Sequence, residues 1–244
     1  MNKMQLTTDK TVSCYDKHVK AYDQYQSVVV PGYQEMLDLV AEAAKRYLPK
    51  EPKIIDLGCG TGNASSAILN RISANIFLID GSGRMVNAAA EKITRESPYA
   101  IQGTRVANLS RNDWDAGLGD STFDAIVSTL VLEHLPFDCY RAVIEKCYHL
   151  LKPGGWLLAA EGYVEEGSDM QEWFFQEMDN RHKELDPEIF DFVARLRDEN
   201  EIHYYCSKAE KAGWWRDAGF EQINIIWQYL CIALMAGRKP SSRF

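Results

Sequence analysis

Glycines occupy alternate positions of one short segment of this 244-residue chain, at Gly58, Gly60 and Gly62. They follow the apolar run 53–57 and precede a helical pattern, so the backbone can turn tightly there and approach a ligand closely. Asp80 ends the next apolar run, where a carboxylate can accept hydrogen bonds from both hydroxyls of a ribose. The GxGxG spacing differs from the GxGxxG of diphosphate-binding loops, and it predicts a nucleoside ligand without a diphosphate.

Two further positions could handle a proton beside such a ligand. His134 follows the apolar run 123–129, and imidazole can act as a base near neutral pH. Tyr15 belongs to a tyrosine-rich N-terminal segment that could orient this ring. A structural interpretation of His134 stays open, in which the imidazole caps a helix or bonds to the backbone. No two histidines pair with carboxylates at a metal-binding spacing, so we predict no metal site.

The elements that position these residues alternate between strand and helix. Continuous apolar runs at 53–57, 75–80, 123–129 and 156–161, with a weaker strand at 104–109, indicate a parallel sheet buried on both faces. The pattern divides the chain into a lid segment (1–34), a cofactor-binding core (35–162), a helical cap insertion (163–208) and a C-terminal helix with strands (209–244). The aromatic residues of the insertion suit either a packed core or an acceptor pocket, and both interpretations remain open.

Several segments together resemble the class I S-adenosylmethionine-dependent methyltransferases. They are DLGCGTGN at 56–63, the acid Asp80, FDAIVSTLVLEHL at 123–135, LKPGGWLLAAE at 151–161 and the leading YDKHVKAYD at 15–23. The resemblance implies an α/β, Rossmann-like, doubly wound and mostly parallel seven-stranded sheet. It also implies S-adenosylmethionine as cofactor, S-adenosylhomocysteine as product, and methyl transfer by in-line displacement to a small-molecule acceptor.

The resemblance also implies roles for individual residues. The glycines would approach the methionine part of the cofactor, Asp56 its ammonium, and Asp80 its ribose. Asn108 would replace the carboxylate that the family often places at the adenine amino group. The full set of expected cofactor contacts is Tyr22, Asp56, Gly58, Cys59, Gly60, Gly62, Asp80, Gly81, Ser82, Met85, Asn108 and Leu109. The expected catalytic residues are His134 and Tyr15.

Two other functions compete with a small-molecule methyltransferase. The segments 31–36 and 211–239 are similar to tRNA-wobble-uridine carboxymethyltransferases, which use carboxy-S-adenosylmethionine. Those enzymes hold the extra carboxylate with an arginine shortly before the AGF at 218–220. Here that position is Trp214, which cannot pair with a carboxylate, although Arg216 lies two residues on. We therefore expect ordinary S-adenosylmethionine to be preferred. The third possibility is a regulatory protein that binds the cofactor without turnover.

The composition of the chain limits which binding partners and which cellular location we expect for the protein. The charge sum of 27 basic and 35 acidic residues is −8, which argues against a protein that binds nucleic acid by its overall charge. The six cysteines form no tight metal spacing, the N-terminus has no apolar signal region, and no apolar run is long enough for a membrane span. These features predict a cytoplasmic monomer or homodimer that does not enter membranes.

Overall fold

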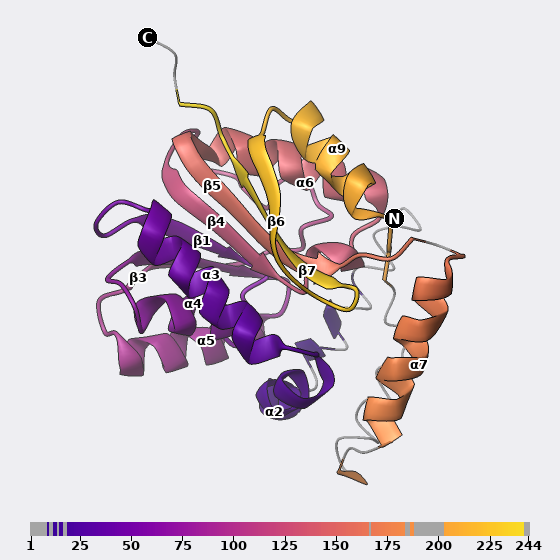
Figure 1. The fold of residues 1–244 in the computed structure, drawn as a ribbon. Coiled ribbons are helices and arrows are strands. Elements are labelled where there is room, and N and C mark those ends of the chain that lie inside the picture. Colours follow the sequence, from indigo (N-terminus) through magenta and orange to yellow (C-terminus); the bar gives the residue numbers. More distant parts are fainter. Residues whose placement is uncertain are drawn as a thin grey trace.

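The computed structural model describes residues 9, 12–13, 15–16, 19–165, 167–183, 186–187 and 203–241. The strands are β1 (Lys53–Leu57), β2 (Asn75–Asp80), β3 (Ile101–Val106), β4 (Phe123–Thr129), β5 (Leu151–Gly162), β6 (Glu221–Tyr229) and β7 (Ile232–Arg238). Within the described residues they form one seven-stranded sheet in the order β3-β2-β1-β4-β5-β7-β6 (Figure 1). The strands β1 to β5 pair in parallel, whereas β7 lies antiparallel to both β5 and β6. The predicted doubly wound, mostly parallel sheet is confirmed.

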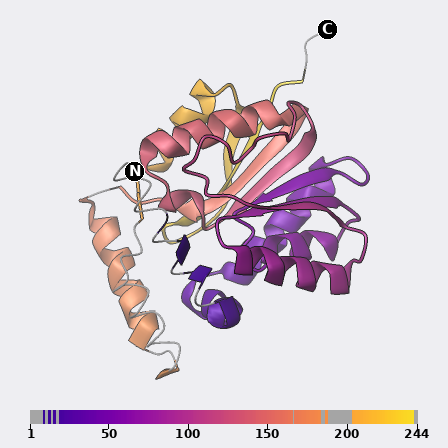
Figure 2. The ribbon, with the colours of Figure 1, turned by 180° about the vertical axis from the view of Figure 1, so that it is seen from behind.

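Helices cover both faces of the sheet. The described helices are α2 (Val19–Val29), α3 (Tyr33–Tyr47), α4 (Asn63–Leu69), α5 (Gly83–Glu96), the 3₁₀ helix η1 (Leu132–His134), α6 (Phe137–Leu150), α7 (Asp169–Lys183) and α9 (Lys208–Asp217), of which α3, α4, α5, α6 and α9 pack on the faces. Successive side chains of a strand point to opposite faces, so Ile54 packs with the side chains of α3, α4 and α5. Ile55 packs with those of α6 and α9 on the other face, which is the nearer one in Figure 2.

The third strand differs from its prediction. It spans Ile101–Val106 rather than 104–109, which places Asn108 and Leu109 in the loop that follows it. β3 is an edge strand, and its residues alternate between half-buried and exposed, so it lacks the continuous apolar run that marks the inner strands. β5 also begins earlier than predicted, at Leu151, and includes the Lys152–Gly155 segment.

Two segments lie at the end of the sheet where the parallel strands finish. α2 packs there against α3, and α7 projects away from the sheet in both views (Figures 1 and 2). α7 belongs to the predicted insertion, and it also contacts α2. Residues 184–185 and 188–202 of that insertion lie outside the described residues, including two of its aromatic side chains, Phe190 and Phe192.

Candidate functional site

A cavity opens at the carboxyl ends of β1, β2, β3 and β4. Its described lining is Val12, Tyr15, Tyr22, Gly58, Gly60, Asp80, Gly81, Met85, Ala107, Asn108, Leu109, Leu130, Val131, His134 and Leu135. The structure thus brings together most of the expected site residues, from five separate stretches of the chain. Four expected residues do not line the cavity: Asp56, Cys59, Gly62 and Ser82. Carboxyl ends of parallel strands meet at one edge of a sheet, which explains why residues so distant in sequence converge.

The glycine-rich loop folds tightly over the end of β2. The N–H groups of Gly58 and Cys59 both donate to the carbonyl oxygen of Ile79, at 2.7 and 2.9 Å. Gly58 has φ +74°, and a Cβ built on it would lie 2.3 Å from Cγ2 of Val131. Only glycine fits both the backbone angle and this close approach. The loop backbone therefore forms part of the cavity wall itself.

Asp80 presents its carboxylate beside this loop. The N–H of Gly60 donates to its Oδ2 at 2.9 Å, and the N–H of Ser82 donates to its Oδ1 at 2.8 Å. Burial raises the pKa of Asp80 above its ordinary value, while these backbone donors oppose the rise. Each oxygen of a carboxylate can accept a second hydrogen bond. Asp80 can therefore receive two hydroxyl groups of a ligand that lies along the loop.

Two of the expected residues that do not line the cavity, Asp56 and Ser82, bind the first turns of α4 and α5. Asp56 is buried, and its Oδ2 accepts from the hydroxyl of Ser65 at 2.5 Å and from its N–H at 3.3 Å. Its Oδ1 has no hydrogen-bond partner among the described residues, and burial raises the pKa of Asp56 to about 6. The hydroxyl of Ser82 accepts from the N–H of Met85 at 3.1 Å and so caps α5. Both residues shape the loops that carry the cavity lining.

The side chain of Asn108 is already engaged on both sides. Its Nδ2 donates to Oδ1 of Asp9 at 2.7 Å, and its Oδ1 accepts from the N–H and the hydroxyl of Ser110 at 2.9 and 2.8 Å. The amide therefore fixes the loop after β3 and contacts the N-terminal segment.

Aromatic rings gather around His134 at the other end of the cavity. His134 is buried on η1, and its ring centroid lies 5.8 Å from that of Tyr15 and 4.5 Å from that of His203. His203 in turn stacks on Tyr205 at 5.1 Å. Burial lowers the pKa of His203 well below its ordinary value, so this ring is neutral at pH 7. This pair could not be predicted from sequence, because 69 positions separate the two histidines.

A buried charged group beside His134 was also missing from the sequence-based prediction. Glu133 is 4% exposed, and its Oε2 has no hydrogen-bond partner among the described residues. Burial raises the pKa of Glu133 to about 7; His134 and Lys211 lower it, whereas Glu161 adds to the rise. Lys211 and Glu161 form a fully buried ion pair behind it. Sequence alone does not show that a Glu next to a predicted base is removed from water.

The described residues contain no group of three His, Cys, Asp or Glu side chains that could hold a metal ion. Among the described helices, none combines the length and the apolar character that a membrane crossing requires.

Comparisons with known proteins agree with this architecture. A family model described as a methyltransferase domain matches residues 55–157. The carboxy-S-adenosyl-L-methionine synthase of Chromohalobacter salexigens is 26% identical over 240 residues, which cover 96% of this chain and 83% of the relative. The protein of that name from Shewanella amazonensis is 33% identical over 148 residues, which cover 58% of this chain and only 57% of the relative.

A solved structure shows the same fold. It is an O-methyltransferase family protein from Burkholderia thailandensis, with a TM-score of 0.65 and 20% identity, covering 92% of this chain and 60% of the other. The matched residues 55–157 include the glycine-rich loop, Asp80 and the η1 segment. Residues 55–157 are thus similar to a methyltransferase domain, and most of the chain is similar to a carboxy-S-adenosyl-L-methionine synthase.

Proposed function

We propose that this chain transfers a methyl group from S-adenosylmethionine to a small-molecule acceptor held beside His134. The observation that carries the proposal is the single cavity that Asp80, the glycine-rich loop, Met85 and His134 line together. The cofactor fits these residues, because the partly buried Asp80 carboxylate can accept further hydrogen bonds beside a loop whose close approach at Gly58 requires glycine. Gly58 and Gly60 would face its methionine part, Asp80 its ribose, and Met85 with Leu109 its adenine.

The residues of the cavity need to contribute little chemistry to the transfer itself. The cofactor supplies an activated methyl group, so the protein must hold an acceptor in line with it. Tyr15 and Tyr22 contact each other edge to face, with ring centroids 5.8 Å apart, and both line the cavity. They would exclude water and orient the acceptor. His134 would take the proton of an acceptor that must lose one.

The lining favours a neutral or cationic acceptor of small size. The described lining residues include no arginine or lysine that could pair with a phosphate or a second carboxylate. Several of them are aromatic or apolar, and aromatic faces attract cations. The N-terminal segment also forms part of the wall through Val12, Tyr15 and Tyr22, which limits the room for a macromolecule.

A second candidate is chemistry with carboxy-S-adenosylmethionine, and the names of the relatives favour it. The geometry of the described residues supports it less. Trp214 packs its ring 5.4 Å from those of Phe137 and Tyr140, and neither Trp214 nor Arg216 lines the cavity. We expect S-adenosylmethionine to bind more tightly than its carboxylated analogue in a competition titration. Tighter binding of the carboxylated form would favour carboxy-S-adenosylmethionine as the cofactor.

The direct test of the function is product formation. The purified protein is incubated with S-adenosylmethionine and a panel of small hydroxyl, amine and thiol compounds, and S-adenosylhomocysteine is quantified by chromatography. We expect formation that depends on one class of acceptor and is lost in Asp80→Ala. Cofactor binding without product from any acceptor would instead support a regulatory protein.

The role of His134 can be tested once an acceptor is found. For a hydroxyl or ammonium acceptor, His134→Ala should lower turnover by about 10²–10⁴, the usual effect of losing a general base. Cofactor affinity should stay nearly constant. A structural histidine would give the opposite pattern, with a lower melting temperature and unchanged turnover per folded molecule. For a thiolate or neutral amine acceptor, His134→Gln should be nearly silent.

A further inference from the structure

Three aspartates of the N-terminal segment recur at intervals of seven residues, at Asp9, Asp16 and Asp23. Each contacts a different loop at the carboxyl end of the sheet: the loop after β1, the loop after β2 and the loop after β3. On every loop the aspartate meets the same two kinds of group. One is a polar side chain on or next to the loop, and the other is a basic side chain, which is Lys92 of α5 for Asp23, Arg84 for Asp16 and Arg111 for Asp9.

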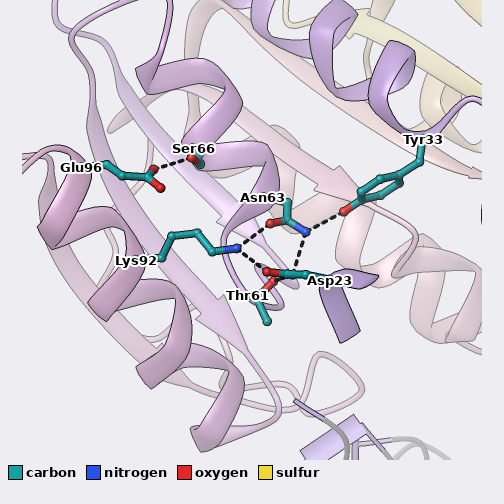
Figure 3. Close-up of polar contacts among 7 residues, drawn as sticks. All are labelled: Asp23, Tyr33, Thr61, Asn63, Ser66, Lys92 and Glu96. Atoms are coloured by element: carbon teal, nitrogen blue, oxygen red, sulfur yellow. Dashed lines mark hydrogen bonds and ion pairs between the residues drawn. The ribbon is translucent and has the colours of Figure 1, made fainter. Parts of the chain in front are cut away.

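The contacts of Asp23 are drawn in Figure 3. The hydroxyl of Thr61 donates to its Oδ1, and Nδ2 of Asn63 donates to the same atom at 3.0 Å. Nζ of Lys92 lies 2.8 Å from its Oδ2 and also donates to Oδ1 of Asn63 at 2.6 Å. Burial alone would raise the pKa of Asp23, but the hydrogen bonds from Lys92 and Thr61 bring it below its ordinary value. Asp23 is therefore an ionised anchor on the glycine-rich loop.

Asp16 repeats this arrangement on the loop after β2. Its Oδ1 accepts from the hydroxyl of Ser82 at 2.6 Å, and its Oδ2 lies 3.4 Å from Nε of Arg84. Ser82 is the residue whose N–H also binds Asp80. The contact thus reaches the carboxylate that the proposed function assigns to the ribose through a single intervening residue.

Asp9 makes the third contact, on the loop after β3. Its Oδ1 accepts from Nδ2 of Asn108 at 2.7 Å and lies 3.6 Å from a guanidinium nitrogen of Arg111. Between these anchors, Val12, Tyr15 and Tyr22 line the cavity. A Cβ built on Gly81 would lie 2.5 Å from Val12, and one built on Gly60 would lie 3.3 Å from the ring of Tyr22. The described residues Asp9, Val12, Asp16, Tyr22 and Asp23 are therefore in close contact with the loops.

We propose that Asp9, Asp16 and Asp23 are positioning residues that latch the N-terminal segment over bound S-adenosylmethionine, one on each of the three cofactor loops. The inference rests on the proposed function, because it takes the cavity as the cofactor site. The segment supplies part of the cavity wall, so the cofactor leaves only when the three contacts separate. Each aspartate is at least one-third exposed, so each contact is weak alone and sensitive to salt. Three weak contacts allow the lid to reopen after each turnover, which one strong contact would hinder.

The test is the dissociation rate of S-adenosylmethionine from the full chain. Stopped-flow displacement by excess S-adenosylhomocysteine is measured for the wild type, the three single alanine variants and the triple variant D9A/D16A/D23A. We expect each single variant to release the cofactor about twofold to fivefold faster, and the triple variant at least about eightfold faster. Asp38→Ala is the matched control, because Asp38 pairs with Arg71 at 3.2 Å on the surface, away from the cavity. Its release rate should equal that of the wild type.

Salt provides a second measurement that does not depend on turnover. Release from the wild type should accelerate between 50 and 500 mM NaCl, because screening weakens exposed ion pairs. Release from the triple variant should be nearly independent of salt. Equal release rates for the folded triple variant and the wild type would overturn the latch while leaving the proposed function intact. A wild type that binds no S-adenosylmethionine would overturn both.

Discussion

At the scale of single residues, the imidazole of His134 lies beside two buried carboxyl groups and one buried cation. Glu133 and Glu161 are both buried, and Lys211 is the cation that pairs with Glu161. One oxygen of Glu133 has no hydrogen-bond partner among the described residues. A carboxylate without a counter-charge is costly to bury, which explains why the pKa of Glu133 rises to about 7. Glu133 is therefore a group that changes charge near neutral pH.

This pKa makes a prediction about stability. An unfolded glutamate loses its proton near pH 4.5, whereas folded Glu133 keeps it until about pH 7. The folded state then binds more protons than the unfolded state between these values, so the free energy of unfolding falls as the pH rises through this window. We expect Glu133→Gln to remove about 1–3 kcal/mol of this decline, as measured by urea unfolding at pH 5.0 and pH 7.5.

Asp56 serves as the internal control for that experiment. Burial raises its pKa to about 6, so it titrates in the same window in both proteins and cancels in the difference. The diagnostic quantity is the slope of the free energy of unfolding against pH. A constant difference in that free energy between the two proteins is not diagnostic, because any substitution can change it. Parallel pH profiles for the wild type and Glu133→Gln would show that Glu133 does not titrate there.

At the scale of elements, the strand ends were predictable and the contacts between distant segments were not. The inner strands read as apolar runs, so Asp80 and the glycines could be placed at the ends of β1 and β2 from sequence. The edge strand β3 lacks that pattern and was placed three residues too late. The N-terminal aspartates were missed because hydrophobic periodicity carries no information on polar pairs such as Asp9 and Asn108, which are 99 positions apart.

The buried ion pair shows how one helix is fixed to the sheet. Lys211 on α9 pairs with Glu161 on β5, whose Oε1 accepts from the hydroxyls of Tyr140 and Tyr163 at 2.8 and 3.2 Å. Trp215 donates to the hydroxyl of Tyr140 at 2.9 Å and extends the network. The two tyrosines and Lys211 therefore all bind the carboxylate of Glu161.

Removing that cation should destabilise the protein strongly. Lys211→Met leaves Glu161 buried without its counter-charge, and we expect a loss of about 3–5 kcal/mol in the free energy of unfolding. Lys208→Met is the control, because Lys208 lies one turn earlier on α9 and donates to Gln228 at the surface. It should cost less than about 1 kcal/mol. Equal losses in the two variants, measured by urea unfolding, would contradict this account of the network.

At the scale of the whole molecule, the side chains that line the cavity lie together at the carboxyl ends of the parallel strands. One face of the sheet is covered by α3, α4 and α5, and the opposite face is covered by α6 and α9. α2 lies at the carboxyl end of the parallel strands (Figure 1), and Val12, Tyr15 and Tyr22 line the cavity there. The sheet and its helices therefore form the base on which these loops and the described N-terminal residues would build the proposed cofactor and acceptor sites.

The central claim is that S-adenosylmethionine binds in this cavity with Asp80 receiving its ribose hydroxyls. Isothermal titration calorimetry of the wild type and Asp80→Ala tests it directly, with circular dichroism and melting as checks that the variant is folded. The variant loses a charged acceptor for two hydroxyls, so we expect binding to weaken by about 1.5–3 kcal/mol, or roughly 10-fold to 150-fold in Kd. An unchanged Kd in the folded Asp80→Ala variant would contradict the account.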